Sequence, residues 1–432
     1  MIFMNRVARE SFVRLHRLVD KLFFAQTSLD RGVYPSGVIS DDLARHALPE
    51  HQFDTLTFSQ NQLVSIPYHQ FYSREFQAIE SELDFLLTQD LEEGLLVFIR
   101  LVKQTCKTND WSQLERQWLE HIHLTDRYVW SFGPVEALSD HLFHSKRFFT
   151  ALLLEKDFDK ERIVDTILQE VSAFHRALPV SGSITPAKTH FLLGNIVSWG
   201  GELEHEVVVG WSRPESTDLL RQYGTVKQVF LNILQKKIDE IYVPIAKIIF
   251  TGQQQERAVR FLQSSLYIGI FLHELCHTIG KFEGYRDRLG DCYPTLEETR
   301  TDFTAYLFAR YLEDKGILSK GFAADMVLGY FAVHLHMLLV YQQTGRRLPY
   351  ANTCFYFFGV LQDILGVTGE GIITFFDESE VQKRMEKAAV ELLRLAKEEE
   401  KSAVRQVFLP NLTALSLVDI LKEKGIVVDP IF

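Results

Sequence analysis

The chain has 432 residues, of which 46% are hydrophobic and 24% are charged. This is an ordinary composition for a globular protein and excludes a disordered tail, a collagen-like repeat and a disulfide miniprotein. At roughly 150 residues per domain, the length predicts two or three folding units. The net charge of −11 disfavours nucleic acid as a partner, since binding to its backbone requires clustered positive charge.

The cysteines and the apolar segments indicate the cellular compartment of the protein and whether it associates with a membrane. Its four cysteines lie far apart and form no Cys-x-x-Cys pair, which predicts a reducing, cytoplasmic location. Residues 1–24 lack the uninterrupted apolar core of a secretory signal, so we expect an amphipathic helix there. The longest apolar stretch, Met326–Tyr341, is shorter than the ~18–20 residues that span a bilayer. We therefore expect a buried core helix and no membrane partner.

Hydrophobic spacing predicts the remaining elements in chain order. The first part of the chain is predicted to be mainly helical, as in Phe76–Gln104, where apolar residues recur at three- and four-residue spacing. Residues 179–189 are rich in Pro, Gly, Ser and Thr and predict a loop, and the β-branched run in Gly201–Trp211 predicts a strand. Thr225–Tyr242 predicts an amphipathic helix, followed by a second helix that runs through Gly280.

Two later helices complete the prediction, one from near Thr295 to Lys315 and one over Met385–Lys401. We therefore predict a mainly α fold with a small β component (α+β). The predicted regions are an N-terminal mainly helical region at residues 1–178 and a strand-containing connecting region at 190–250. A helical lobe at 251–402 and a C-terminal extension at 403–432 follow.

The segment His273-Glu274-Leu275-Cys276-His277 is an HExxH pattern. Positions i and i+4 of a helix share a face, so both imidazoles can reach one metal ion. Glu274 follows the first histidine and can act as general base on a zinc-bound water. The competing interpretation is a helix with two core or surface histidines and a solvated glutamate. Cys276 most simply packs as a small apolar group; as a fourth ligand it would close the site and indicate structural zinc.

A catalytic zinc site needs a third protein ligand, and Glu298 lies 21 residues after His277. Asp302 falls one helical turn later on the same face, where it could accept the N–H of a zinc-bound imidazole. The connecting loop also contains three alternative third ligands, Glu283, Asp287 and Asp291.

Two interpretations without a metal also fit this segment. Thr295-x-x-Glu298 follows a proline and has the spacing of a capping box, in which the glutamate closes the first helical turn. Glu297 and Arg300 are placed for an i, i+3 ion pair on the surface.

A hydrolase also needs a donor that stabilises the oxyanion. Four side chains downstream could supply it: Tyr330, His334, His336 and Tyr350. Tyr330 and His334 share one face of the apolar helix, whereas His336 points elsewhere. Each is alternatively a satisfied core residue.

Three segments, HELCHTIGK, LEETRTD and GVTGEGIIT, resemble dipeptidyl peptidase III, a zinc exopeptidase family. The resemblance covers Leu262–Phe376, with a weaker one over Phe191–Tyr242. It implies a two-lobed zincin-like metallohydrolase with one zinc ion per chain, held in the helical lobe at 251–402. Carried over by position, it implies that the zinc ligands are His273, His277 and Glu298. It also implies that Glu274 is the catalytic base. The residues that support the ligands would be Glu297, Arg300 and Asp302.

The chain departs from the family at defined places. Two residues, rather than three, separate Glu274 from His277, and the chain is far shorter than eukaryotic members. The family's substrate histidine falls near Cys354, and its anchor for a peptide amino terminus falls within residues 196–201, which contain no carboxylate. The sequence predicts a zinc-dependent hydrolase, most simply a metallopeptidase that cleaves short peptides. The alternatives are a zinc hydrolase or lyase of the same fold acting on a non-peptide small molecule, and a non-catalytic, zinc-stabilised binding protein.

Overall fold

The computed structural model describes residues 4–30, 53–59, 62–121, 126–136, 147–186, 188–206, 208–214, 217–345, 347–375, 378–398 and 401–426. The chain divides into two compact units. The first combines Met1–Asp157 with Leu192–Ile233, and the second combines Phe158–Phe191 with Leu234–Pro430. These bounds differ from those of the four predicted regions, because hydrophobic periodicity is local and does not reveal which distant segments pack together.

The first unit is built on a five-stranded sheet with the strand order β3-β4-β5-β7-β6. The strands are β3 (Tyr128–Glu136), β4 (Arg147–Lys156), β5 (Thr189–Gly201), β6 (Gly210–Arg213) and β7 (Thr225–Phe230). The pairs β3–β4, β4–β5 and β6–β7 are antiparallel. Because eight of the ten residues of β4 are buried, this strand lacks the alternation of polar and apolar residues that identifies a half-exposed strand. The mainly helical prediction for the first part of the chain was therefore incomplete.

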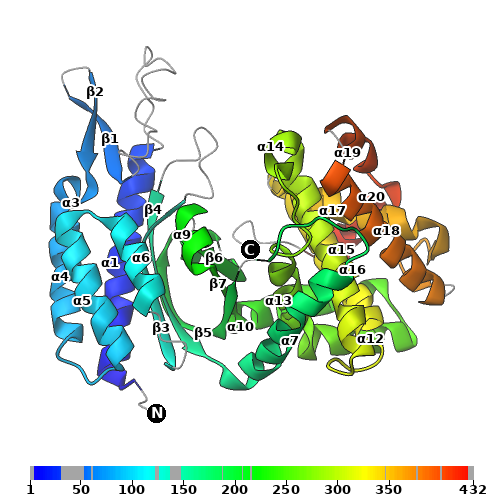
Figure 1. Ribbon diagram of the computed structural model, residues 1–432, viewed down its shortest axis with the longest axis horizontal. Coiled ribbons are helices and arrows are strands. Elements are labelled where there is room, and N and C mark those ends of the chain that lie inside the picture. Colours follow the sequence, from blue (N-terminus) through cyan, green and yellow to red (C-terminus); the bar gives the residue numbers. More distant parts are fainter. Residues whose placement is uncertain are drawn as a thin grey trace. The chain divides into compact units, whose positions relative to one another are not determined.

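Helices pack beside this sheet. The N-terminal helix α1 (Arg6–Asp30) contacts α4 and β4, and it buries Phe12, Leu15 and Val19 completely, which confirms the predicted amphipathic helix. Figure 1 shows α1, α4 and α5 side by side. The other elements of this unit are β1 (Asp54–Ser59), β2 (Gln62–Pro67), α3 (Tyr68–Phe71), α4 (Ser73–Leu86), α5 (Glu93–Thr108), α6 (Trp111–His121), α8 (Glu202–Glu206) and α9 (Thr217–Tyr223).

The strand predicted over Gly201–Trp211 is wrong for most of its described residues: only Gly201, in β5, and Gly210 and Trp211, in β6, lie in strands, and Val207 is outside the described residues. Strand β5 ends at Gly201, and the following residues form α8, because Glu-Leu-Glu-His-Glu contains good helix formers. Gly201 has a φ of +81°, and a Cβ atom there would lie 2.0 Å from the carbonyl oxygen of Phe149. The strand therefore turns into the helix at a position where only glycine fits.

The helix predicted over Thr225–Tyr242 is only partly right. Its first six residues form β7, and all of them are buried. The helix begins at α10 (Leu231–Lys237) and continues as the π-helix η2 (Ile238–Tyr242). Strand β7 buries the polar side chains of Thr225, Lys227 and Gln228 together with its apolar ones. It therefore lacks the alternation that identifies a half-exposed strand, which explains the error.

The second unit is helical apart from a small hairpin, so the predicted α+β class is confirmed. Helix α15 contacts α13, α16, α17 and α18 and forms the centre of the unit. The described elements are α7 (Phe158–Ala177), α11 (Val243–Ile249), α12 (Gly252–Ser264), α13 (Leu266–Cys276), α14 (Tyr285–Leu289), η3 (Gly290–Cys292), α15 (Tyr293–Asp314), α16 (Phe322–Thr344), α17 (Leu348–Leu361), η4 (Gln362–Ile364), β8 (Leu365–Val367), β9 (Ile373–Phe375), α18 (Glu378–Glu398), α19 (Lys401–Val407) and α20 (Leu412–Glu423).

The long helix predicted to end at Gly280 consists of two helices. The break between α12 and α13 is at Ser265, and α13 ends at Cys276. The segment Gly369-Glu370-Gly371 lies in the turn between β8 and β9, which are paired antiparallel.

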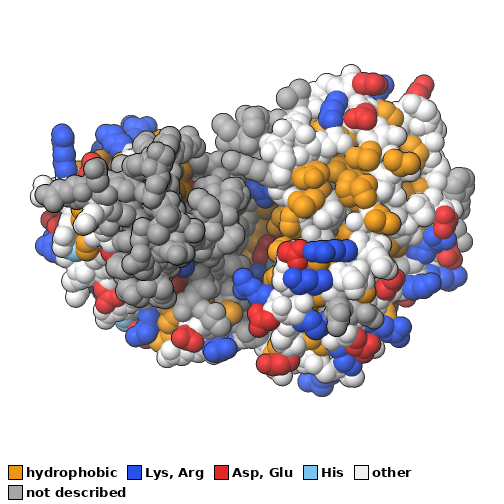
Figure 2. All heavy atoms as spheres, turned by 90° about the horizontal axis from the view of Figure 1, so that it is seen from above, with side chains coloured by type: hydrophobic (Ala, Val, Ile, Leu, Met, Phe, Trp, Pro, Cys, Tyr) orange, Lys and Arg blue, Asp and Glu red, His pale blue; other side chains and the backbone are white. Residues whose placement is uncertain are grey.

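Helix α16 is long and apolar enough to cross a membrane by length and composition, and the bent pair α19–α20 passes the same criterion as one segment. Of the apolar window of α16, 78% is buried inside the protein, as in a core helix. Apolar side chains also gather on the surface of the second unit (Figure 2). The most exposed large ones in the described chain are Leu409 and Leu412, at 65% and 80%, which flank the turn between α19 and α20.

Candidate metal centre

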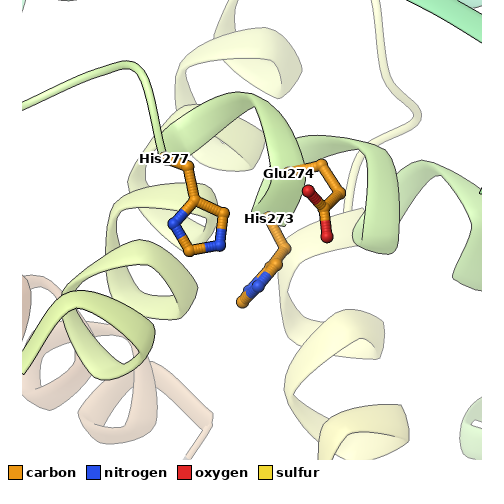
Figure 3. A group of neighbouring side chains, drawn as sticks. All are labelled: His273, Glu274 and His277. Atoms are coloured by element: carbon orange, nitrogen blue, oxygen red, sulfur yellow. The ribbon is translucent and has the colours of Figure 1, made fainter. Parts of the chain in front are cut away.

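The end of α13 carries the HExxH pattern. The apolar residues Leu266–Leu272 hold this helix in the core, and His277 is the first residue after its last turn. Figure 3 shows the two imidazoles and the carboxylate of Glu274 on one side of the helix. Their ligand atoms all lie within 4.8 Å of one another, and the two imidazole rings are 4.9 Å apart with perpendicular planes. The spacing of the pattern therefore brings three potential ligand or base groups together.

Helix α15 adds a second carboxylate, that of Glu298. Its Oε2 atom lies 3.3 Å from Nε2 of His273 and 3.8 Å from Nε2 of His277. Ligand atoms arranged tetrahedrally around one zinc ion at about 2 Å lie roughly 3.3–3.5 Å apart, so these separations are close to those of a shared ion. The same oxygen is buried and accepts no hydrogen bond from the described residues. A buried carboxylate oxygen without a donor, facing two imidazole nitrogens, fits a bound cation.

The Nδ1 atoms of both histidines point to other carboxylates. Nδ1 of His273 lies 2.6 Å from Oδ1 of Asp302, and Nδ1 of His277 lies 3.0 Å from Oε1 of Glu297. When each Nδ1–H donates to its carboxylate, the lone pair of each Nε2 faces Glu298. Burial alone would raise the pKa of the Asp302 carboxyl, but His273 lowers it below its usual range. Asp302 therefore stays ionised and keeps the ring oriented.

Glu297 is held from the other side by Arg300. Nη2 of Arg300 lies 3.0 Å from Oε2 of Glu297, and the hydroxyl of Tyr285 donates to the same oxygen. Arg300 also donates to the carbonyl oxygens of Ile279, at 2.6 Å, and Cys276, at 3.2 Å, at the end of α13. Burial would raise the pKa of the Glu297 carboxyl, but the Arg300 guanidinium holds it well below its usual range. The predicted surface ion pair therefore exists but is buried, because Arg300 joins α15 to α13.

The capping-box interpretation of Glu298 is wrong. Helix α15 begins at Tyr293, after Cys292, and no side chain caps it. Thr295 lies inside the first turn, where its hydroxyl accepts a hydrogen bond from Asn352 at 3.3 Å. The proline that suggested the start of the helix occupies an early helical position, which proline tolerates, so the helix starts before the predicted cap.

The competing loop carboxylates are engaged elsewhere or open to solvent. Glu283 and Asp287 are exposed. Asp291 forms ion pairs with Lys401, at 3.0 Å, and with Arg405, at 2.5 Å. Of these four carboxylates, Glu298 is therefore the one that the structure places beside both imidazoles, as a third ligand requires.

Tyr330 and His334 lie on the buried face of α16. The Tyr330 hydroxyl and Nε2 of His334 are both buried and make no hydrogen bond within the described chain. Nε2 of His334 lies 3.7 Å from Oδ2 of Asp302, the carboxylate that contacts Nδ1 of His273. His336 packs against Tyr242, with the ring centres 5.5 Å apart, and burial lowers its pKa to about 3. Its predicted orientation away from Tyr330 and His334 agrees with this contact.

Tyr350, at the start of α17, lies within electrostatic reach of Glu298. The negative charge of Glu298 is the main cause that raises the pKa of the Tyr350 hydroxyl well above its usual value, with burial second. The phenol is therefore neutral at physiological pH and can donate a hydrogen bond near Glu298. Of the four predicted donors, Tyr350 is the one with the strongest electrostatic link to that carboxylate.

The two cysteines of interest are buried. Cys276 and Cys354 are completely buried and neither forms a disulfide with a described residue, which agrees with apolar packing of Cys276 inside the motif. Tyr285, by contrast, was missed by the sequence prediction, although its hydroxyl supports Glu297. It lies in α14, within the loop between the two motifs, and nothing in the local sequence distinguishes it from a core tyrosine.

The chain has little sequence similarity to known proteins. No family model matches the chain. The chain is 22% identical over 295 residues to Nudix hydrolase 3 of Arabidopsis thaliana, a match that covers 63% of the chain and 36% of that protein. The chain thus spans about a third of the length of this curated relative.

Solved structures match over almost the whole chain. Dipeptidyl peptidase III from Caldithrix abyssi superposes with a TM-score of 0.82 at 14% identity, covering 96% of this chain and 92% of that one. The enzyme from Corallococcus sp. strain EGB gives a TM-score of 0.74 at 17% identity, with 96% and 90% covered. The likeness extends well beyond Leu262–Phe376, where the sequence resemblance was concentrated. The chain therefore has a fold similar to that of dipeptidyl peptidase III, as the three sequence segments predicted.

Proposed function

We propose that the chain is a zinc-dependent hydrolase and, more specifically, a metallopeptidase that cleaves short peptides. The observation that carries the proposal is the convergence of Nε2 of His273, Nε2 of His277 and Oε2 of Glu298, with Glu274 beside them. Two imidazoles and one carboxylate are a donor set that suits zinc, and three protein ligands leave a position open for chemistry.

Each residue has a role that follows from its position. Bound zinc would supply a Lewis acid that polarises the scissile carbonyl and lowers the pKa of water. Glu274 takes the proton from the attacking water and delivers it to the leaving amine. Asp302 and Glu297 hold the imidazoles in the tautomer that exposes Nε2. Tyr350, as a neutral phenol next to Glu298, donates a hydrogen bond to the developing oxyanion.

A non-peptide small molecule is the second candidate substrate. Cys354, near which the resemblance places a substrate histidine, is completely buried. Residues 196–201, where the resemblance places an anchor for a peptide amino terminus, contain no carboxylate. These two differences favour a substrate that is not held by its amino terminus. The third candidate, a zinc-stabilised binding protein, has no use for a base at Glu274.

Hydrolysis of a peptide library by wild type and by Glu274→Gln tests the proposal. We expect cleavage by the wild type and a loss of at least about 100-fold in the variant, the lower range for a general base. Glu283→Gln is the matched control, because this carboxylate is exposed. Equal cleavage by Glu274→Gln would remove Glu274 from the mechanism. A wild type that cleaves amide or ester metabolites but no peptide would establish the second candidate.

The cellular context stays a prediction. All four cysteines are described and buried and none forms a disulfide, as a reducing compartment allows, and we propose a cytoplasmic location on that basis. The exclusion of nucleic acid and of a membrane as partners rests on the charge and hydropathy of the sequence alone.

A further inference from the structure

The first unit contains a cavity of about 350 Å³. Its described lining residues are Phe53, Arg147 and residues within the ranges 98–134 and 213–222. All of them belong to the first unit. No residue of the metal centre contributes to it. The volume is at the lower end of the range of about 300–1,000 Å³ that is typical of small-molecule sites.

Five of the sixteen described residues that line this cavity are aromatic, and five are charged. Trp111 and Trp118 come from α6, Phe132 from β3 and Phe98 from α5. Trp111 and Phe132 lie with their ring centres 6.2 Å apart. Aromatic walls of this kind favour a ligand with a flat apolar or aromatic body.

One charged group, Arg213, lines the cavity and is almost completely buried, with 4% of its surface exposed. Its guanidinium lies over the rings of Trp211, at 4.7 Å, and Trp118, at 5.4 Å. Nε makes no hydrogen bond with the described residues, and Oε1 of Glu115, at 3.4 Å, forms an ion pair with it. Buried guanidinium N–H groups require acceptors, so the incomplete set at a cavity wall points to an acceptor from a ligand.

The surrounding charges indicate what that acceptor is. Arg116, Arg147, Glu115 and Asp218 are the other charged residues of the described lining. Burial lowers the pKa of Arg213, the Glu115 carboxylate opposes this, and the charge of Arg147 adds a smaller lowering. An anion can accept hydrogen bonds from the Arg213 guanidinium, but Glu115 beside it opposes a second negative charge on that anion. A singly charged carboxylate fits this balance better than a phosphate dianion.

We propose that this cavity is a binding site for a small aromatic carboxylic acid. The carboxylate accepts paired hydrogen bonds from Arg213, and the ring packs among Trp111, Trp118 and Phe132. The site is independent of the metal centre and of the proposed hydrolase activity, because it shares no residue with either.

Titration of the full-length protein with 3-phenylpropionate tests the proposal, with tryptophan fluorescence as the readout. Two of the five tryptophans line the cavity and a third, Trp211, stacks on Arg213, so binding should change the emission. We expect saturable binding of one probe per chain, with 3-phenylpropionamide and phenyl phosphate each at least about tenfold weaker, since a hydrogen bond to a charged group contributes at least that factor. Equal binding of the amide, tighter binding of the phosphate or no saturation would overturn the proposal.

Two variants locate the site. Arg213→Met should weaken 3-phenylpropionate about tenfold or more, whereas Arg100→Met, an exposed arginine on α5, should leave its binding unchanged. His273→Ala should bind the probe as the wild type does; a loss there would place the probe at the metal centre and refute the cavity site. If Arg213→Met fails to fold, the comparison of acid, amide and phosphate on the wild type still decides the question.

Discussion

The carboxylate of Asp302 lies 2.6 Å from Nδ1 of His273. Glu298, one helical turn earlier, faces Nε2 of the same ring. Both nitrogens of one imidazole are thus matched by carboxylates from successive turns of α15. This pairing orients His273 before any cation binds.

Asp302→Asn should weaken zinc binding about 10- to 100-fold, the usual effect of losing an outer support of a metal ligand. The amide can still accept a hydrogen bond but no longer carries the charge that makes the ring more basic. Competition with a chelating dye measures the affinity. Asp314→Asn is the control, since this carboxylate is exposed at the end of the same helix. Unchanged zinc affinity in Asp302→Asn would mean that the contact with His273 is incidental.

Glu298→Ala should abolish tight zinc binding without disrupting α15. The helix starts at Tyr293 and is not capped by Glu298, so neither Glu298→Ala nor Thr295→Ala should show a capping defect. Loss of a cap costs about 0.5–2 kcal/mol, which urea unfolding of the metal-free proteins would detect. Zinc retained in Glu298→Ala, together with a destabilisation of that size, would restore the capping-box interpretation.

Arg300→Met should destabilise the protein by about 3–5 kcal/mol, the cost of leaving the partner of a buried ion pair uncompensated. Arg300 is completely buried, and besides Glu297 it binds two carbonyl oxygens at the end of α13. Lys383→Ala, which removes an exposed ion pair with Glu380, should change stability by less than about 1 kcal/mol. Urea unfolding monitors both. Similar small effects for the two variants would show that Arg300 does not hold the motifs together.

The metal-free protein should lose stability as the pH rises above the ordinary pKa of histidine. Burial would lower the pKa of His273, but Asp302 and Glu298 together raise it well above 6.5. A group whose pKa is higher in the folded state stabilises the fold fully below the unfolded pKa of about 6.5, and this stabilisation disappears as the pH passes the folded value. Urea midpoints from pH 6 to 9 should therefore fall, and fall less in Asp302→Asn. Midpoints that do not depend on pH in either protein would contradict this linkage.

Zinc should reverse that trend. The cation and the proton compete for Nε2 of His273, so zinc affinity should rise over the same pH range in which the metal-free protein is destabilised. Calorimetric titration at several pH values would show it as proton release on binding. Binding that becomes weaker with rising pH would exclude His273 as a ligand.

The sequence predicted the part of the site that depends on one helix. His273, Glu274 and His277 come together because positions i and i+4 share a face, and Asp302 was found in the same way from Glu298. That Glu298 lies against both imidazoles depends on the packing of α15 on α13, which the resemblance rather than local spacing supplied. The burial of Arg300 and the role of Tyr285 depend on tertiary contacts alone and had no local signal.

The fold was predictable to a similar degree. Helix α15 was predicted to within two residues at both ends, whereas the predicted ends of α1 and α18 differ from the observed ones by three to seven residues. Strand β4 is mostly buried and mostly apolar, and strand β7 buries the polar residues Lys227 and Gln228. Neither strand therefore has the polar–apolar alternation of a half-exposed strand. The two-unit division was hidden because each unit is assembled from separate segments of the chain.

The zinc content of the purified protein tests the central claim most directly. Elemental analysis should give about one zinc per chain for the wild type and for His121→Ala, an exposed histidine at the end of α6, and almost none for His273→Ala. Circular dichroism of all three proteins confirms that they are folded. A wild type that binds no zinc, or a folded His273→Ala that keeps it, would contradict the assignment of the metal centre.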